Sequence, residues 1–242
     1  MIFKNPFAKP EVDFEFIDVS RNIYQKIPVV PAKSIVPRGK AKQMAASGAF
    51  KFAHCPGILD YSQLGYIIPA WTDMKIFANG AGVVAEIGSA HRGTRGFMSP
   101  VTMDPSIVEG FLAPTDGVPL TVLKFECPWY IRAAKGVSAL TMPAWYHADW
   151  TEDLHCWPGS VDYTNFSVTN FIVSPKRKCV VHIKAGDPLL HIIPFYGKDM
   201  LAGYGPGSDA QVDKTKNEVY GDQPQFYRRM LAIKKAFGLV RK

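Results

Sequence analysis

The fold class is decided by two stretches, Phe166-Ser167-Val168-Thr169-Asn170-Phe171-Ile172-Val173 and Cys179-Val180-Val181-His182-Ile183. Both have the length of a β-strand, are rich in β-branched and aromatic residues, and are bounded by turn formers. Four earlier runs are of the same kind: Gly65-Tyr66-Ile67-Ile68-Pro69, Met74-Lys75-Ile76-Phe77, Val83-Val84-Ala85-Glu86-Ile87 and Leu120-Thr121-Val122-Leu123-Lys124-Phe125. The sequence therefore predicts a mainly β body over residues 49–200, of the β-clip or double-sheet (jelly-roll-like) kind.

The segments on either side of this body differ from it in composition. Within the predicted arm, residues 1–48, the stretch from Lys9 to about Gly48 is punctuated by Pro10, Pro28, Pro31 and Pro37. Because each proline biases the preceding residue to extended backbone, we expect an extended N-terminal arm. Residues 201–242 begin with a glycine-rich loop and end with one α-helix, predicted from about Pro224 to Phe237. The apolar residues that recur there at helical spacing are Phe226, Met230, Ile233 and Phe237.

The composition excludes several classes of protein. Of the 242 residues, 47% are hydrophobic and 20% are charged, which is too apolar for an intrinsically disordered chain. No run approaches the roughly 18 apolar residues that cross a bilayer, so we expect no membrane partner. Residues 1–6 show no secretory signal, and a chain of this length can bury a core without disulfides.

The cysteines form no Cys-x-x-Cys pair of the kind that a structural zinc site requires. They are Cys55, Cys127, Cys156 and Cys179. We interpret them as buried thiols in a reducing cytoplasm. His54 and His155 each precede a cysteine, but neighbours on a strand point to opposite faces, so we predict no catalytic Cys–His couple from them.

The net charge of +7 is concentrated in patches that could meet nucleic acid or an acidic partner. The patches are Arg38, Lys40 and Lys42; Lys176-Arg177-Lys178; and Arg228-Arg229, Lys234-Lys235 and Arg241-Lys242. No interleaved row of aromatic residues accompanies them, as a single-strand-binding groove would require. We therefore interpret the patches as an ordinary solvated surface, with a weak nucleic-acid contact as the alternative.

Two parts of the β body echo each other. Cys55-Pro56 is followed by Gly65 and then Pro69-Ala70-Trp71, and Cys127-Pro128 is followed by Gly136 and then Pro143-Ala144-Trp145. Two similar halves would produce this echo, and chance repetition is the alternative.

A His-x-Asp pair, His147 and Asp149, offers two ligands of the kind that hold iron(II), and His191 could supply a third. The string Leu189-Leu190-His191-Ile192-Ile193-Pro194 resembles the distal-histidine strand of iron and 2-oxoglutarate dioxygenases, which implies iron bound by these three residues. Those enzymes place a basic residue after this histidine to bind oxoglutarate, where the chain has Met200-Leu201-Ala202. We therefore predict no cofactor and keep the metal site as an alternative.

The segments Cys156–Asn170 and Ile183–Phe195 resemble the second half of the dUTPase and dCTP deaminase fold. The resemblance implies tight turns at Gly159 and Gly186, and it places Asp162 at a strand entrance, where the carboxylate would orient water or accept a ribose hydroxyl. The chain lacks that family's Arg-Ser-Gly phosphate loop and its glycine-rich phosphate clamp. A nucleotide-binding or hydrolysing enzyme with Asp162 in its site is therefore an alternative function.

Over a greater length, about residues 51–195, the pattern resembles a family of uncharacterised proteins of tailed bacteriophages, many of them marine. The strings that carry this resemblance are Cys55-Pro56-Gly57-Ile58, Ile68-Pro69-Ala70-Trp71-Thr72-Asp73, Cys127-Pro128-Trp129-Tyr130-Ile131-Arg132, Lys135-Gly136-Val137-Ser138, Pro158-Gly159-Ser160-Val161-Asp162, Gly186-Asp187-Pro188-Leu189 and Ile193-Pro194-Phe195. The resemblance implies no catalytic residues. We therefore predict a non-enzymatic structural or assembly protein, in the host cytoplasm or the virion, that binds copies of itself or other virion subunits.

Overall fold

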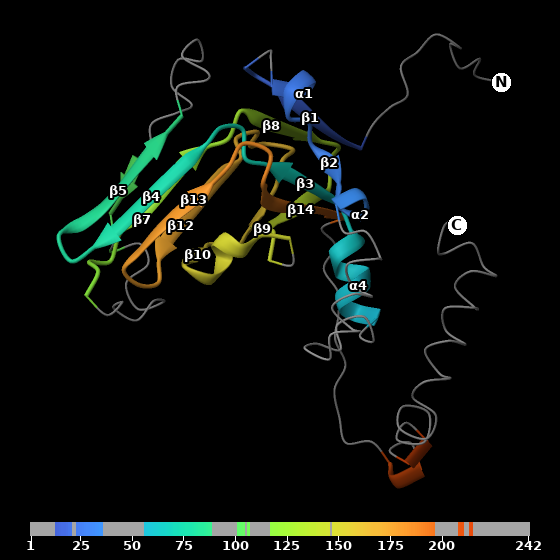
Figure 1. The fold of residues 1–242 in the computed structure, drawn as a ribbon. Coiled ribbons are helices and arrows are strands. Elements are labelled where there is room, and N and C mark those ends of the chain that lie inside the picture. The colour runs from blue at the N-terminus through green and yellow to red at the C-terminus, as the bar shows by residue number, and fades with distance from the viewer. Residues whose placement is uncertain are drawn as a thin grey trace. The chain divides into compact units, whose positions relative to one another are not determined.

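The computed structural model describes residues 13–20, 23–35, 56–88, 101–104, 106, 117–145, 147–196, 208–210 and 213–214. The chain divides into two compact units, Met1–Lys198 and Asp199–Lys242, and the elements named below belong to the first (Figure 1). The helices are α1 (Ile23–Lys26), α2 (Ala32–Ile35), α4 (Pro56–Gln63) and the 3₁₀-helix η4 (Asp149–Glu152). The strands are β1 (Phe14–Asp18), β2 (Val30–Pro31), β3 (Tyr66–Pro69), β4 (Met74–Asn79), β5 (Gly82–Ile87), β6 (Val101–Met103), β7 (Val122–Glu126), β8 (Trp129–Ala133), β9 (Val137–Pro143), β10 (Leu154–Cys156), β11 (Gly159–Val161), β12 (Asn170–Pro175), β13 (Cys179–Ile183) and β14 (Pro188–Tyr196).

The strands form four antiparallel sheets, which confirms the predicted mainly β, double-sheet body. The sheet orders are β13-β4-β5, β10-β12-β7-β6, β11-β9-β14-β3-β2 and β1-β8. The predicted helix over residues 224–237 lies outside the described residues, as do residues 1–12 and 36–48 of the predicted arm.

The β4–β5 hairpin shows how the sequence specifies local structure. Alternate residues of β4 are buried, as expected for a strand with one face on the core. At the turn, Asn79 Oδ1 accepts hydrogen bonds from the backbone N–H groups of Ala81 (2.8 Å) and Gly82 (3.2 Å). Because this side chain bonds its own turn, Asn79 faces Gly82 across the hairpin and the register of the two strands is set.

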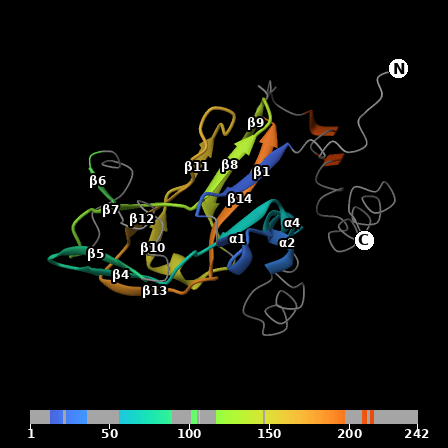
Figure 2. The ribbon, with the colours of Figure 1, turned by 90° about the horizontal axis from the view of Figure 1, so that it is seen from above.

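Two of the sheets, β13-β4-β5 and β10-β12-β7-β6, lie as separate layers (Figure 2). The side chains between them belong to one core cluster, in which Ile76 and Val181 face each other across β4 and β13. Phe125 and Phe171 face each other across β7 and β12 with ring centroids 5.6 Å apart, and Trp150 meets Phe171 edge-on at 5.3 Å. Full burial of each phenylalanine contributes about 1.5–3 kcal/mol to stability. The core cluster that these side chains share with Ile76 and Val181 joins the two layers.

The five-stranded sheet has β14 at its centre, between β9 and β3, and it packs against the β1–β8 pair. Phe16 on β1 meets Tyr66 on β3 with ring centroids 5.2 Å apart, and Phe14 meets Tyr163 at 6.0 Å. Strands β1 and β2 belong to residues 1–48. Part of the predicted N-terminal arm is therefore paired with strands of the body.

A corner links the five-stranded sheet to the β13-β4-β5 sheet, where residues 70–73 meet residues 184–187. The Ala70 N–H donates to the Asp187 carbonyl oxygen, and the Gly186 N–H donates to the Ala70 carbonyl oxygen, both at 2.8 Å. Asp73 Oδ1 accepts a hydrogen bond from the Ala185 N–H at 2.8 Å. Gly186 has a φ of 94°, a conformation that favours glycine, so the predicted tight turn at Gly186 is confirmed.

The predicted turn at Gly159 is wrong. Gly159 begins β11 and faces Thr141 of β9, so Asp162 follows the end of a strand and does not enter one. The physical reason is the side chain of Asp162, which accepts a hydrogen bond from the Thr164 N–H and so places the turn after the strand. Residues 166–169 are likewise outside β12, which begins at Asn170.

The repeated Pro-Ala-Trp segments occupy corresponding places on the two sides of β14. β3 ends at Pro69 and β9 ends at Pro143, and both strands run antiparallel to β14. The N–H groups of Ala70 and Ala144 donate to backbone carbonyls just before and within β14, at 2.8 and 3.2 Å. Both strand ends therefore pair with the first residues of β14, Pro69 with Pro188 and Pro143 with Leu190.

The rest of the two echoing segments differs. Trp71 is buried, whereas Trp145 is 48% exposed. Pro56 begins helix α4, whereas Pro128 lies between strands β7 and β8. The correspondence is therefore limited to β3 and β9 themselves, whose ends match and which each follow a glycine of positive φ, Gly65 (65°) and Gly136 (81°).

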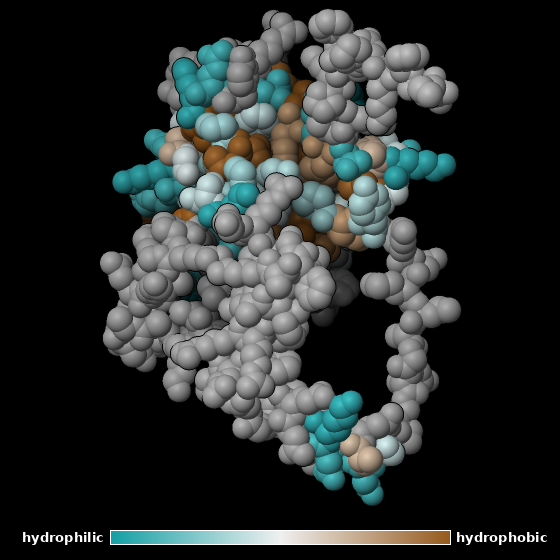
Figure 3. All heavy atoms as spheres, turned by 90° about the vertical axis from the view of Figure 1, so that its right-hand side faces the viewer, coloured by the Kyte–Doolittle hydropathy of each residue, from teal (hydrophilic) through white to brown (hydrophobic). Residues whose placement is uncertain are grey.

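Large apolar side chains also reach the surface of the first unit. In the view of Figure 3, hydrophobic atoms gather near the centre of the described surface, with hydrophilic atoms around them. The exposed large hydrophobic side chains among the described residues are Leu64, Val84, Val101, Leu140, Trp145, Phe166, Val180, Phe195 and Tyr196. Within the described part of the chain, none of the helices has the length and apolar character needed to cross a membrane.

Candidate functional site

Two of the histidines singled out from the sequence come together beside helix α4. His191 lies in β14, facing Ile67 on β3 and Met142 on β9, and its side chain is fully buried. His147 follows β9, and its ring meets that of His191 edge-on with centroids 6.2 Å apart. Tyr61 of α4 meets His191 with ring centroids 5.0 Å apart. We call Tyr61, Met142, His147 and His191 the histidine cluster.

The hydrogen bonds of the cluster fix the tautomer of one ring. His191 Nε2 lies 2.6 Å from the Leu64 carbonyl oxygen. Because a carbonyl oxygen only accepts, Nε2 carries the proton, and in the neutral ring Nδ1 keeps a lone pair. Among the described residues, His191 Nδ1 is buried without a hydrogen-bond partner, and so is His147 Nε2. Two imidazole nitrogens in one cluster therefore have no partner in this part of the chain.

Both imidazoles are held neutral at physiological pH. Burial, followed by the nearby His191, lowers the pKa of His147 to about 4. Burial also lowers the pKa of His191, against the opposing effect of the hydrogen bond to Leu64. Neutral imidazole is the form that presents a lone pair to a proton donor or a metal ion.

The third predicted iron ligand does not join this pair. Asp149 is exposed at the start of η4. Among the described residues there is no group of three or more His, Cys, Asp or Glu side chains that could hold a metal ion. The structure therefore brings His147 and His191 together without Asp149.

Asp162, the alternative catalytic residue, forms hydrogen bonds within its own turn. Its Oδ1 accepts a hydrogen bond from the Thr164 N–H at 2.9 Å, and its Oδ2 accepts one from Asn165 Nδ2 at 3.3 Å. The hydrogen bonds from Thr164 hold the pKa of this exposed carboxyl below its ordinary value. An ionised, exposed carboxylate of this kind is typical of a turn.

The cysteines within the described residues are free thiols, namely Cys127, Cys156 and Cys179. Burial raises the pKa of Cys127 and of Cys156 to about 12, so both stay protonated and unreactive. Cys179 is partly buried, and burial raises its pKa as well. The prediction of buried thiols holds for Cys127 and Cys156, while Cys55 lies outside the described residues.

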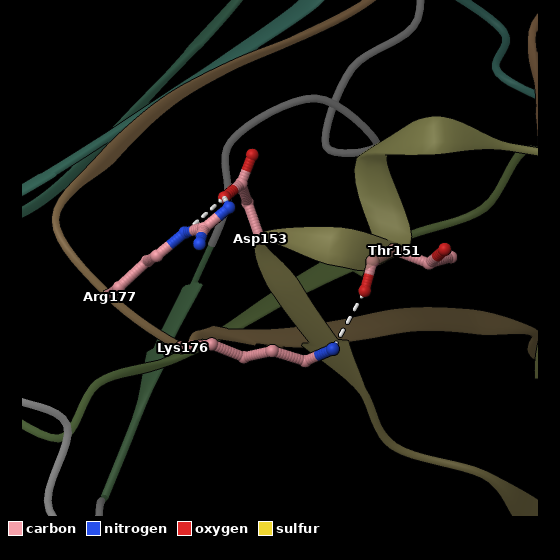
Figure 4. Close-up of polar contacts among 4 residues, drawn as sticks. All are labelled: Thr151, Asp153, Lys176 and Arg177. Carbon is pink, nitrogen blue, oxygen red and sulfur yellow. Dashed lines mark hydrogen bonds and ion pairs between the residues drawn. The ribbon is translucent and has the colours of Figure 1, made fainter.

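Of the predicted basic patches, only Lys176-Arg177-Lys178 falls within the described residues. Lys176 Nζ donates to the Thr151 carbonyl oxygen at 2.7 Å, and Arg177 forms an ion pair with Asp153 at 2.6 Å (Figure 4). These contacts tie the loop between β12 and β13 to the region of η4. Two of the three cations therefore have partners within the protein.

A row of apolar side chains crosses the outer face of the β13-β4-β5 sheet. Val180, Phe77 and Val84 face one another across the three strands. Val84 and Val180 are 60% and 55% exposed, and Phe77 is half-buried. Lys75 Nζ lies 4.4 Å from the centroid of the Phe77 ring. We call Val180, Phe77 and Val84 the apolar row.

A charged row runs beside the apolar row on the same face. His182, Lys75 and Glu86 face one another across β13, β4 and β5. The ion pairs found in the described part of the chain are Arg132–Glu15 and Arg177–Asp153, so neither Lys75 nor Glu86 is in one.

The chain matches no protein-family model, and no curated protein matches it. The function is therefore inferred from the chemistry of the side chains described above.

Sequence reasoning named His147 and His191 but missed Met142, Tyr61 and the apolar row. Met142 gives no signal in the sequence, because only the pairing of β9 with β14 brings it opposite His191. The apolar row could be found in part, since Val84 and Val180 occupy the solvent-facing positions of strands that alternate with period two.

Proposed function

We propose that the protein is a non-enzymatic structural or assembly component of a bacteriophage particle, and that copies of the chain bind one another through the outer face of the β13-β4-β5 sheet. The observation that carries the proposal is the apolar row, because a contiguous apolar strip on an exposed face is typical of a protein–protein contact. The resemblance to tailed-bacteriophage proteins and the double-sheet architecture support the particle as the setting, with the β-clip topology as part of this proposal.

The charged row supports a second copy of the chain as the partner. In a twofold-symmetric contact the same face of each copy forms the interface. If residue i of one copy contacts residue j of the other, then residue j of the first copy also contacts residue i of the second. Lys75 and Glu86 lie side by side on β4 and β5, and a twofold axis between the strands would bring each opposite its counterpart of opposite charge. The face is therefore self-complementary in charge as well as apolar.

The enzymatic alternatives receive less support. Asp162 is engaged by Thr164 and Asn165, and a triphosphate would need cationic or N–H donors that the missing phosphate loop does not supply. Asp149 does not complete an iron site with the histidines. A binding role needs neither group.

Self-association is tested by size-exclusion chromatography with light scattering over a range of concentrations. We expect the wild-type protein to form dimers and Val84→Lys to be monomeric, because the substitution places a charge on the apolar row. Val101→Lys is the matched control, since Val101 is 59% exposed on β6 of another sheet. Glu86→Lys should weaken the dimer, and the exchange Lys75→Glu with Glu86→Lys should restore it. A wild-type protein that is monomeric at all concentrations would overturn this interface.

The particle setting is tested separately by mass spectrometry of purified virions and of assembly intermediates. We expect the chain in at least one of these preparations. Its absence from both would remove the particle role and leave the self-association result unaffected.

A further inference from the structure

The histidine cluster has the donor atoms of a metal site. Two of them are histidine nitrogens, which are common metal ligands, and the third is the sulfur of Met142, which is a less common one. His191 Nδ1 and His147 Nε2 are buried and have no hydrogen-bond partner among the residues that the structure describes. Buried polar atoms are nearly always satisfied, so two unsatisfied nitrogens in neighbouring rings point to a ligand that binds both.

The second contact of His191 is the one that a metal-binding histidine makes. A histidine that binds a metal through one nitrogen usually donates its other ring N–H to a carboxylate or a backbone carbonyl, which fixes the ring orientation. His191 Nε2 donates to the Leu64 carbonyl oxygen at 2.6 Å, and this leaves Nδ1 as the free donor atom.

A thioether supplies a third donor of a different kind. Met142 is the partner of His191 across β9 and β14, so the two side chains project from the same face of the sheet. Tyr61 contacts both, because its hydroxyl donates a hydrogen bond to Met142 Sδ at 4.0 Å and its ring centroid lies 5.0 Å from that of His191. Imidazole suits several transition metals, whereas a thioether favours soft ions, and copper(I) accepts both.

We propose that the histidine cluster binds one copper(I) ion through His147 Nε2, His191 Nδ1 and Met142 Sδ. Binding uses lone pairs of neutral ligands, so no bond breaks and no proton is released if the proton of His147 is on Nδ1. Tyr61 packs over the site from α4, and the ion would link the end of β9, the centre of β14 and the helix that covers them.

The test is an anaerobic titration of the full-length protein with copper(I), in competition with a chromogenic copper(I) chelator. We expect one equivalent to be bound, and Met142→Leu to weaken binding by about tenfold or more. This substitution nearly conserves volume, so the fold should persist. His147→Asn should abolish the stoichiometric site, with circular dichroism to confirm that the variant is folded.

Two controls separate this site from other copper ligands. His155→Asn should leave binding unchanged, because His155 packs against Trp157 away from the cluster. Thiolates also bind copper(I), so the double variant Cys55→Ser with Cys179→Ser should retain the single equivalent. X-ray absorption of the loaded protein should show nitrogen and sulfur ligands, and the sulfur contribution should vanish in Met142→Leu. Absence of copper(I) binding, or binding that is the same in Met142→Leu and His147→Asn as in the wild type, would overturn the proposal.

Discussion

Titratable side chains lie where strands meet in two regions, the corner at residues 70–73 and 184–187 and the histidine cluster. The two regions differ in whether these side chains have hydrogen-bond partners. At the corner, Asp73 and Asp187 accept hydrogen bonds from the backbone N–H groups of Ala185 and Lys184, each at 2.8 Å. In the histidine cluster, two buried nitrogens accept or donate nothing. A titratable group with its hydrogen bonds made is part of the scaffold, whereas a buried one without them is available to a ligand.

The largest expected effect concerns the backbone beside the histidine cluster. Gly65 has a φ of 65°, and a side chain there would collide with the backbone carbonyl of Ile192 and approach Ile193 Cα to 3.0 Å. We expect Gly65→Ala to lower the free energy of unfolding by more than about 3 kcal/mol, because the neighbouring atoms are backbone and cannot move aside. Urea unfolding measures this.

A matched glycine in the covering helix serves as the control. A side chain at Gly57 would meet nothing within 4 Å, so Gly57→Ala should leave stability unchanged or raise it by up to about 1 kcal/mol. Equal stabilities of the two variants would show that the close approach at Gly65 is not rigid.

A smaller effect, on the pH dependence of folding stability, distinguishes the two regions. The pKa of His147 is lowered to about 4, and that of His191 is lowered as well. The unfolded chain therefore binds protons on these rings below about pH 6.5, while the folded protein does not, so stability should fall as the pH falls from about 6.5 towards 4. Urea midpoints measured across this window check the expectation.

The comparison variants for the pH series are single histidine substitutions. His147→Asn should make the decline shallower, because one of the groups that takes up a proton on unfolding is removed. His182→Asn, on the exposed face of the β13-β4-β5 sheet, is the control for the loss of a histidine outside the cluster. A decline that is identical in His147→Asn and the wild type would contradict the assignment.

The smallest effect is expected at the corner itself. Asp73→Ala removes the acceptor of the Ala185 N–H, and we expect it to cost about 1 kcal/mol of stability, since the N–H can turn to water. Asp73→Asn keeps an oxygen at the same place and should cost less. Thermal unfolding of the two variants measures the difference, and a larger loss in Asn than in Ala would contradict this role.

Local structure was predictable from the sequence wherever short-range chemistry decides it. The short apolar runs Met74–Phe77 and Val83–Ile87 correctly predict the two strands of the β4–β5 hairpin. Strand β1 was missed, because Phe14–Asp18 becomes a strand only by pairing with β8, far along the chain. Helix α4 was missed as well.

The candidate sites were predictable only in part, for the same reason. His147 and His191 stand out as residue types with metal chemistry, but sequence spacing favoured Asp149 as their companion. The register of β9 against β14 brings Met142 to His191 instead. Such a pairing depends on sheet topology, which a local pattern does not encode.

The central place of β14 has a consequence for synthesis of the chain. β14 is the last strand in the described sequence, yet it joins β9 on one side and β3 on the other. While the ribosome is still making the protein, the edges of β3 and β9 that will pair with it stay open. Long-range pairing of this kind slows folding and leaves strand edges free to pair wrongly. The nascent chain is therefore most exposed to aggregation until residues 188–196 have left the ribosomal tunnel, and a chaperone would be most useful in that interval.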